Sequence, residues 1–494
     1  MSDQPNILLI MTDQQRFDSL GCYGFDAAYT PNLDQLAAEG VLFERCYVNN
    51  PICTPSRASL MTGKHLPGHG VYKLYDNLPA DEVLFPEHLR QHGYDTALFG
   101  KLHVSSLHFE AEQRNPHDGF DTYEWCLEGC VRMDSPYHAY RQWLEQVDPE
   151  FCQRLMTEGR AVKHHPQALH FTHWAAQRTI DFIEGQDGSQ PFFCMMSIFD
   201  PHNPYEDYPL EMLDLLDAAK IPEPMIAEGE SENWPEAIRR ESKHNYLGDF
   251  ADLSPEDLRK MRVGYHASIT FADQEIGRVL AALDAKGIAD NTLVIFTSDH
   301  GDMLGDHELL VKGAFFFDAN VRVPLLMRWP ERGIQGGRRV TSLVQLHDLA
   351  ATILDAAGMT EDARLRWMPE ACSLLDVASG ATERVRDYAV CCYRNSGIST
   401  TGYWDPPINA TMFADERYKL NLFHDSSALA GELYDMHEDP QEFHNLWGKP
   451  DFSSVQAQMT HRLADWLGSQ ERHLGTRGGA QLPTPQQKIP NKLQ

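Results

Sequence analysis

The chain has 494 residues, which is too long for one compact core and suits roughly three domains, or one large α/β domain with a smaller companion. Hydrophobic residues make up 42% of it and charged residues 23%, as in ordinary globular proteins, so disordered and fibrous classes are excluded. Its 42 Lys and Arg against 72 Asp and Glu give a net charge of −30. Nucleic acids and anionic membranes are therefore poor partners, and an anionic substrate needs a local cluster of positive side chains.

No stretch of 18 or more apolar residues is present, so we expect no membrane span. The first residues carry no basic segment, and the apolar run Ile7–Met11 is shorter than the core of a secretion signal. Ten cysteines at irregular spacing do not form the pattern of a disulfide framework. Together these features predict a protein of the reducing cytoplasm.

The first 330 residues contain five near-continuous apolar runs. Such runs are typical of parallel strands that are covered on both faces. They are Ile7–Met11, Thr96–Phe99, Phe192–Phe199, Thr292–Phe296 and Val323–Met327. Helical patterns lie between them, one starting at Thr30-Pro31 and another over Ala175–Glu184. This alternation predicts an α/β fold with a large, mostly parallel sheet flanked by helices.

The pattern changes after about residue 375. Shorter aromatic-rich pieces, such as Tyr388–Tyr393, Met412-Phe413 and Tyr418–Phe423, predict antiparallel strands, and Val455–Leu467 predicts an amphipathic helix. We therefore divide the chain into an α/β domain over residues 1–375, which carries the candidate site, and a smaller α+β domain with an antiparallel sheet and an extended tail over residues 376–494. The stretch 104–170 has no clear pattern, and we interpret it as an insertion beside the site.

Polar side chains follow four of the apolar runs at the point where each run ends. They are Asp13 and Gln14, Lys101 and His103, His202, and Asp299 and His300. In open α/β sheets, ligands bind in the crevice at the carboxyl ends of the strands. We therefore expect these side chains to converge on one site.

A compact motif, Cys53–Arg57 (CTPSR), precedes a helix of small residues that ends at Gly63. Pro55 fits a first helical turn, and Gly63 fits the residue after a helix. Cys53 would then lie at a helix N-terminus, which lowers the pKa of a thiol, and Arg57 would add a positive charge on the same face. Taken alone, the motif also fits a packed structural cysteine.

The motif and its context resemble the type I sulfatases of the alkaline phosphatase superfamily. The CTPSR sequence and the Thr-Gly that ends its helix are similar to the signature of that family. Similar elements follow in the expected order over nearly the whole chain: Asn6–Asp13, Gly100–His103, Ser298–Gly305 with Lys312, and Leu433–Asp435 with Asp439-Pro440 and Asn445-Leu446.

This resemblance implies that a separate maturation enzyme oxidises Cys53 to formylglycine, an aldehyde that hydrates to a geminal diol. One hydroxyl of the diol attacks the sulfur of a sulfate monoester, and the alcohol leaves; deprotonation of the second hydroxyl then expels sulfate. The implied activity is that of a sulfuric ester hydrolase, and the implied substrate is a small-molecule sulfate ester.

The resemblance also implies one divalent metal ion, held by Asp13, Gln14, Asp299, His300 and the modified Cys53. Gln14 and His300 depart from the commonest family pattern, which has an aspartate and an asparagine at these places. They lower the ligand charge and add an imidazole nitrogen. Ca²⁺ is still the expected ion, but these two residues make Mn²⁺ or Zn²⁺ an alternative.

Roles for the positive side chains follow from the same similarity. Lys101 and His202 contact the sulfate and the leaving oxygen, with His202 as the general acid. His103 and Arg57 hold and activate the diol, and Lys312 binds a sulfate oxygen. These groups would supply the positive cluster that an acidic protein needs.

Two alternatives stay open. Gln14 and His300 also occur in phosphonate monoester hydrolases of the superfamily, which favours a phosphonate monoester or phosphodiester hydrolase, whereas Lys101 and His103 favour sulfate. A binding protein that has lost catalysis is disfavoured because Cys53 and the metal aspartates are retained. Assembly into a homo-oligomer also stays open.

The alcohol side of the substrate is less well defined by the sequence. We expect the stretch 104–170 and the C-terminal domain to build its pocket, with Arg394, Asn395 and Trp404 as candidates. The histidines at 164, 165, 170 and 173 have no acidic partner at ligand spacing, so we assign no metal there. Four other cysteines are interpreted as structural thiols: Cys126, Cys130, Cys391 and Cys392.

Overall fold

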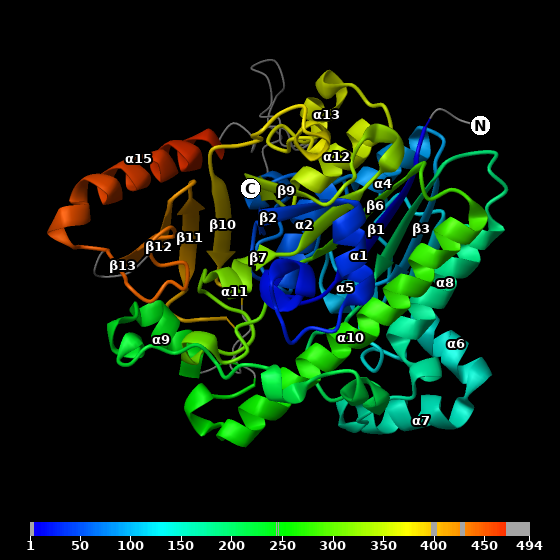
Figure 1. Ribbon diagram of the computed structural model, residues 1–494, viewed down its shortest axis with the longest axis horizontal. Coiled ribbons are helices and arrows are strands. Elements are labelled where there is room, and N and C mark those ends of the chain that lie inside the picture. Colours follow the sequence, from blue (N-terminus) through cyan, green and yellow to red (C-terminus); the bar gives the residue numbers. More distant parts are fainter. Residues whose placement is uncertain (1–3, 244, 246, 397–402, 425–429, 471–494) are drawn as a thin grey trace, which may run out of the picture.

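A computed structural model describes residues 4–243, 245, 247–396, 403–424 and 430–470 (Figure 1). Within these residues, nine strands form one sheet in the order β4-β3-β5-β1-β6-β8-β2-β7, with β9 paired to β2, and four strands form a second sheet. The first sheet consists of β1 (Asn6–Thr12), β2 (Val41–Tyr47), β3 (Asp95–Gly100), β4 (Thr122–Trp125), β5 (Phe192–Ser197), β6 (Thr292–Ser298), β7 (Arg322–Val323), β8 (Leu325–Arg328) and β9 (Arg338–Gln345). The predicted fold class is confirmed.

The centre of the large sheet is β1, which pairs in parallel with β5 on one side and β6 on the other. Alternate residues of β1 enter two different apolar cores: Ile7, Leu9 and Met11 belong to one, and Leu8 and Ile10 to the other. Both faces of the strand are therefore buried. This double burial explains why the sequence shows a continuous apolar run there instead of an alternating one.

Helices cover both faces of this sheet (Figure 1). One face carries α1 (Pro31–Glu39), α8 (Phe171–Gly185) and the long α10 (Pro255–Lys286), and the other carries α2 (Cys53–Thr62), α4 (Phe85–Gln91) and α12 (Asp348–Ala356). Shorter or peripheral helices are α3 (Leu66–His69), α5 (Leu107–Glu110), α6 (Ala139–Val147), α7 (Pro149–Glu158), α9 (Glu236–Lys243), α11 (Asp318–Val321), α13 (Glu361–Trp367) and α14 (Leu375–Ser379).

Three predicted segments differ from the structure. The run Val323–Met327 is not one parallel strand: Pro324, which has no N–H to donate, separates β7 from β8, and β8 pairs antiparallel with β6 and β2. The stretch 104–170 is not a separate insertion, because its strand β4 extends the large sheet in parallel with β3. The prediction of β5 also runs two residues too far, since the strand ends at Ser197.

The second sheet is antiparallel, as predicted, and consists of β10 (Ala389–Arg394), β11 (Asn409–Ala414), β12 (Tyr418–His424) and β13 (Ala430–Asp435). Helix α15 (Ser453–Gln470) packs on it through Met459, Leu463 and Trp466. The sheet is joined to the large one where Gln345 of β9 exchanges hydrogen bonds with the backbone of Val390. The domain boundary at residue 375 stays a prediction. Within the described ranges, none of the helices has the length and apolarity needed to cross a membrane.

Candidate active site

The polar residues that follow the apolar runs do meet at one edge of the large sheet. Asp13 and Gln14 follow β1, Lys101 and His103 follow β3, His202 lies beyond β5, and Asp299 and His300 follow β6. Cys53 and Arg57 come from α2, and Lys312 comes from the loop between β6 and β7. All of these side chains are buried.

Helix α2 begins at Cys53, as the motif predicts, and ends before Gly63, whose φ of 66° is the left-handed conformation that glycine adopts readily. Every residue of the helix is buried. The Ser56 hydroxyl donates a hydrogen bond to the backbone carbonyl of Asp299 at 2.6 Å. The helix is therefore fixed directly to the end of β6, and its N-terminus faces the site.

Arg57 links the two aspartates. Its Nη2 donates to Asp13 Oδ2 at 3.0 Å, and its Nε donates to Asp299 Oδ2 at 2.6 Å. Its Nη1 donates to the Lys101 carbonyl and the Ser197 hydroxyl, so one buried guanidinium holds the ends of β1, β3, β5 and β6. Lys101 Nζ also donates to Asp13 Oδ2, at 2.5 Å.

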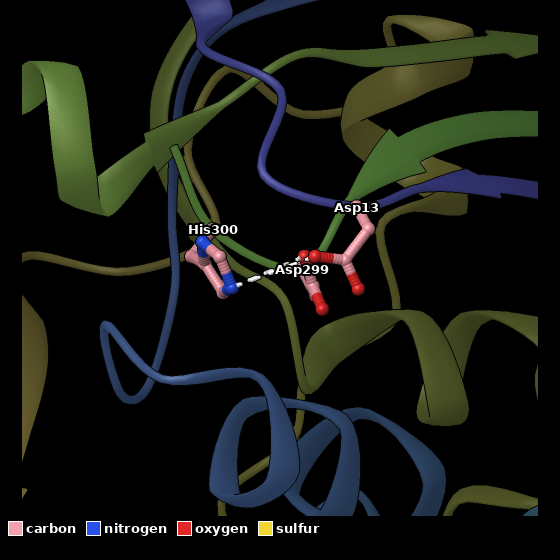
Figure 2. Close-up of side chains that lie close together, drawn as sticks. All are labelled: Asp13, Asp299 and His300. Carbon is pink, nitrogen blue, oxygen red and sulfur yellow. Dashed lines mark ion pairs between the residues drawn. The ribbon is translucent and has the colours of Figure 1, made fainter. Parts of the chain in front are cut away.

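The other carboxylate oxygens face His300 (Figure 2). His300 Nε2 lies 3.6 Å from Asp299 Oδ1 and 3.9 Å from Asp13 Oδ1. Asp13 Oδ1 and Gln14 Oε1 are buried atoms without a hydrogen-bond partner among the described residues. Ligands about 2.0–2.6 Å from one ion can lie at such spacings. The two carboxylate oxygens, the imidazole nitrogen and the amide oxygen of Gln14 thus form a set of four donor atoms that suits a divalent cation.

Gln14 lies at this position with a left-handed backbone, at φ 66°. Its backbone N–H donates to Asp299 Oδ1 at 3.1 Å, and its Nε2 donates to Asp302 Oδ2 at 2.6 Å. These contacts orient both Gln14 and Asp299. Whether Gln14 and Cys53 are metal ligands stays a prediction.

Lys312 lies between the two site histidines and the cysteine. Its Nζ is 3.1 Å from His202 Nε2, 3.0 Å from His300 Nε2 and 3.8 Å from Cys53 Sγ. The Nδ1 atoms of both histidines lie 2.9 Å from backbone carbonyls, which assigns their protons to Nδ1 and leaves Nε2 to accept from Lys312. Burial, reinforced by Lys312, lowers the pKa of His202 well below its ordinary value, so this imidazole is neutral.

The charge balance of the site favours anions. Burial alone would raise the pKa of Asp13, but the positive charges of Lys101, Arg57 and Lys312 bring it well below its usual value. Burial would likewise raise the pKa of Cys53, yet Lys312, Lys101 and His103 lower it well below that of a free thiol. Each of the other nine cysteines has a raised pKa, and burial is the main cause: Cys22, Cys46, Cys126, Cys130, Cys152, Cys194, Cys372, Cys391 and Cys392. Cys53 is thus distinct in its electrostatic environment.

His103 is held by a residue that the sequence did not suggest. The carboxylate of Glu110, on α5, accepts three consecutive backbone N–H groups, from His103, Val104 and Ser105, at 2.8–3.1 Å. The indole N–H of Trp125 also donates to it, at 3.0 Å. The backbone of His103 is left-handed, at φ 57°, and its Nε2 lies 3.0 Å from the Thr54 hydroxyl. No sequence pattern indicates that Glu110 accepts hydrogen bonds from the turn that begins seven residues earlier, at His103.

A pocket of about 270 Å³ opens above Cys53, and Lys101, His103, His202 and Lys312 also line it. The stretch 104–170 contributes several of its walls, as expected. The three C-terminal candidates do not line it: Arg394 donates to the carbonyl of Ala410, and Asn395 hydrogen-bonds to the backbone of Trp404. Among the described residues, the second sheet therefore contributes no wall to this pocket.

His170 lies beside two acids that are distant in the sequence, contrary to the expectation from local spacing. Its Nδ1 is 3.8 Å from Asp200 Oδ2, and a carboxylate oxygen of Asp207 lies close to both. Thr172 donates its backbone N–H to His170 Nδ1 and its hydroxyl to Asp200. Since α8 begins at Phe171, we interpret His170 and Asp200 as the cap of that helix.

Comparisons with known proteins agree with this fold and site. Residues 5–359 match the sulfatase family, and residues 305–468 match the C-terminal domain of N-sulphoglucosamine sulphohydrolase. The chain therefore belongs to the sulfatase family, within the alkaline phosphatase superfamily, and is a hydrolase of that family. The predicted family is confirmed.

Individual relatives are similar over nearly their whole length. An arylsulfatase of Clostridium perfringens is 30% identical over 90% of each chain. A choline-sulfatase of Rhizobium meliloti is 30% identical over 94% of this chain and 87% of its own. Among solved structures, the phosphonate monoester hydrolase of Agrobacterium radiobacter superposes with a TM-score of 0.80 at 27% identity, covering 94% of this chain and 96% of its own.

Proposed function

We propose that the protein hydrolyses sulfate monoesters to an alcohol and inorganic sulfate, with residue 53 converted to formylglycine. The observation that carries the proposal is the position of Cys53: it lies in the pocket within reach of Lys312, beside the donor set of Asp13, Asp299 and His300. The pocket floor bears positive groups, although the protein as a whole has a net charge of −30. An anionic group would therefore be stabilised there and repelled elsewhere.

The residues of this chain have distinct tasks in the proposed reaction. Lys101 and Lys312 bind the oxygens of the sulfate, and His103, held by Glu110, orients the oxygen nucleophile that the modified residue 53 supplies. Lys312 and the neutral His202 form the pair from which the leaving oxygen takes a proton. Arg57 holds Asp13 and Asp299 in place through an ion pair with each of them.

Asp13, Asp299 and His300, with Gln14 Oε1, would hold the metal ion, which when bound polarises the nucleophile and the sulfate. Lys312, whose Nζ lies within hydrogen-bond distance of both His300 Nε2 and His202 Nε2, is placed beside this donor set and within reach of the substrate. Ca²⁺, Mn²⁺ and Zn²⁺ all suit part of this mixed donor set. The cytoplasmic location and the maturation enzyme remain part of the proposal.

A phosphonate monoester hydrolase is the second candidate. The solved enzyme of that name superposes well on this chain, and Gln14 and His300 fit that branch. Phosphoryl and sulfuryl groups would use the same cations. A ratio of kcat/KM for phenyl sulfate to that for phenyl phenylphosphonate above 1 supports the sulfatase assignment, and a ratio below 1 supports the second candidate.

The decisive experiment combines mass spectrometry with kinetics. In protein produced together with a formylglycine-generating enzyme, the tryptic peptide that contains residue 53 should be about 18 Da lighter than the thiol form. Cys53→Ala should lower kcat/KM for an aryl sulfate at least about 1,000-fold while the fold is retained, whereas the matched control Cys22→Ala should not. An unmodified peptide in a fully active enzyme would contradict the proposal.

A further inference from the structure

The pocket above Cys53 has two chemically different ends. Cys53 and the positive side chains of Lys101 and Lys312 form its floor. Most of the remaining lining is apolar. An ester bound with its sulfate on the floor therefore directs its alcohol toward the apolar end.

Two segments build that end. The stretch 104–170 contributes Leu107, Leu127 and Val131, and the loop after α3 contributes Leu74 and Tyr75. Leu127 is buried, whereas Tyr75 is 51% exposed and stands at the rim. The backbone of Leu74 is fixed, since its N–H donates to Ser396 and its carbonyl accepts from Thr54. These walls are therefore ordered and apolar.

The charged residues at this end neutralise each other. Glu128 also lines the pocket, and both of its oxygens accept hydrogen bonds from Arg160, at 2.5 Å each. Such a two-point pair leaves little net field for a substrate to use. The end therefore offers no uncompensated charge for a second sulfate or an ammonium group.

Size gives the last constraint. Pockets for drug-sized molecules run from roughly 300 to 1,000 Å³. The whole of this pocket is about 270 Å³, and the sulfate takes part of it. A single ring with a short substituent fits such a space, whereas a saccharide would place several of its hydroxyls against leucine and valine side chains, which cannot hydrogen-bond to them.

We propose that the pocket selects sulfate esters of compact apolar alcohols, such as alkyl-substituted phenols, and that Val131 sets the length that is accepted. This inference rests on the proposed function and names its substrate class. The 4-alkylphenyl sulfates from methyl to butyl are the probes. Each added methylene should raise kcat/KM about fourfold until the wall is reached, and glucosamine 6-sulfate should be at least about 100-fold poorer than the best of them.

Two variants of Val131 test the limit. Val131→Phe should shift the best substrate to a shorter alkyl chain, and Val131→Ala should shift it to a longer one. The matched control is Val147→Phe, on α6 of the same segment, where the side chain is 54% exposed and outside the pocket. It should leave the chain-length series unchanged.

The outcomes separate this inference from the function on which it rests. If a sugar sulfate is hydrolysed better than every alkylphenyl sulfate, the inference is overturned and the sulfatase proposal stays intact. The same holds if kcat/KM depends on alkyl chain length in the same way in Val131→Phe and Val131→Ala. No turnover of any sulfate ester by fully modified enzyme would overturn both.

Discussion

Glu110 holds the turn that carries His103, because its Oε2 accepts the backbone N–H of His103 at 2.9 Å. Two further backbone N–H groups and one indole N–H donate to the same carboxylate. The buried carboxylate of Glu110 thus takes the place of water as the hydrogen-bond acceptor for the backbone N–H groups of this turn, in which His103 has a left-handed backbone.

Replacing Glu110 with glutamine should lower kcat at least about 10-fold, because a neutral amide accepts fewer of these N–H groups and releases His103. The free energy of unfolding should also fall by about 1–3 kcal/mol. Steady-state kinetics and chemical unfolding measure the two effects. Glu112→Gln, at an exposed position two residues away, is the matched control. Equal behaviour of the two variants would show that Glu110 does not position His103.

Arg57→Gln should strongly destabilise the metal-free protein, since Asp13 and Asp299 would lose the guanidinium that joins them. Removing one partner of a buried ion pair costs about 3–5 kcal/mol. Unfolding in guanidinium chloride with a chelator present measures this cost. Arg154→Gln is the control, because that arginine forms an exposed pair with Glu158 that is worth about 0.5 kcal/mol or less. If both variants unfold at the same denaturant concentration, the bridging role is refuted.

His300→Asn should change the metal preference of the site, because an amide oxygen replaces the imidazole nitrogen. We expect the affinity for Zn²⁺ to fall at least about 10-fold, with a smaller loss for Ca²⁺. Calorimetric titration of chelator-treated protein with each ion measures this change, and wild type should bind one ion per chain. His437→Asn, at an exposed position on the C-terminal part, serves as the control. Unchanged Zn²⁺ affinity would remove His300 from the ligand set.

Glu241 should make the protein less stable as the pH rises from about 4.5 to 7. Burial raises its pKa to about 7, although Tyr393, Ala314 and Trp404 donate hydrogen bonds to it. The folded state then keeps a proton that the unfolded state loses. The resulting stability is complete below the unfolded pKa and is lost as the pH passes through 7, at no more than about 1.4 kcal/mol per pH unit.

Glu241→Gln, which cannot ionise, should therefore flatten the pH dependence of the unfolding midpoint between pH 5 and 8. Glu236→Gln, at an exposed position on the same helix, should leave it unchanged. Parallel curves for wild type and Glu241→Gln would show that Glu241 does not titrate in this range.

Much of the architecture follows from the sequence because burial on both faces leaves a continuous apolar run, as in β1 and β6. The same rule fails for β2, where Glu44 and Arg45 interrupt the run, and for the Val323–Met327 segment, where Pro324 divides the strand. Local patterns predict which strands are buried, but they do not give the direction in which a strand pairs with its neighbours.

The site residues were predictable where a polar side chain comes directly after a strand in the sequence, as Asp13 and Asp299 do. The sequence could not show that the two oxygens of each aspartate have different partners. In both Asp13 and Asp299, Oδ2 accepts a hydrogen bond from Arg57, whereas Oδ1 faces His300. Glu110 was also missed, since its partners are backbone groups and leave no residue pattern.

The complete burial of α2 has a consequence for biosynthesis. Cys53 is 3% exposed, and every residue of its helix is packed against the rest of the molecule. An enzyme that must grip an extended peptide to oxidise this thiol cannot do so once the helix has docked. If Cys53 is converted as proposed, the conversion has to take place before the chain folds. A molecule that folds before its Cys53 is oxidised then stays inactive.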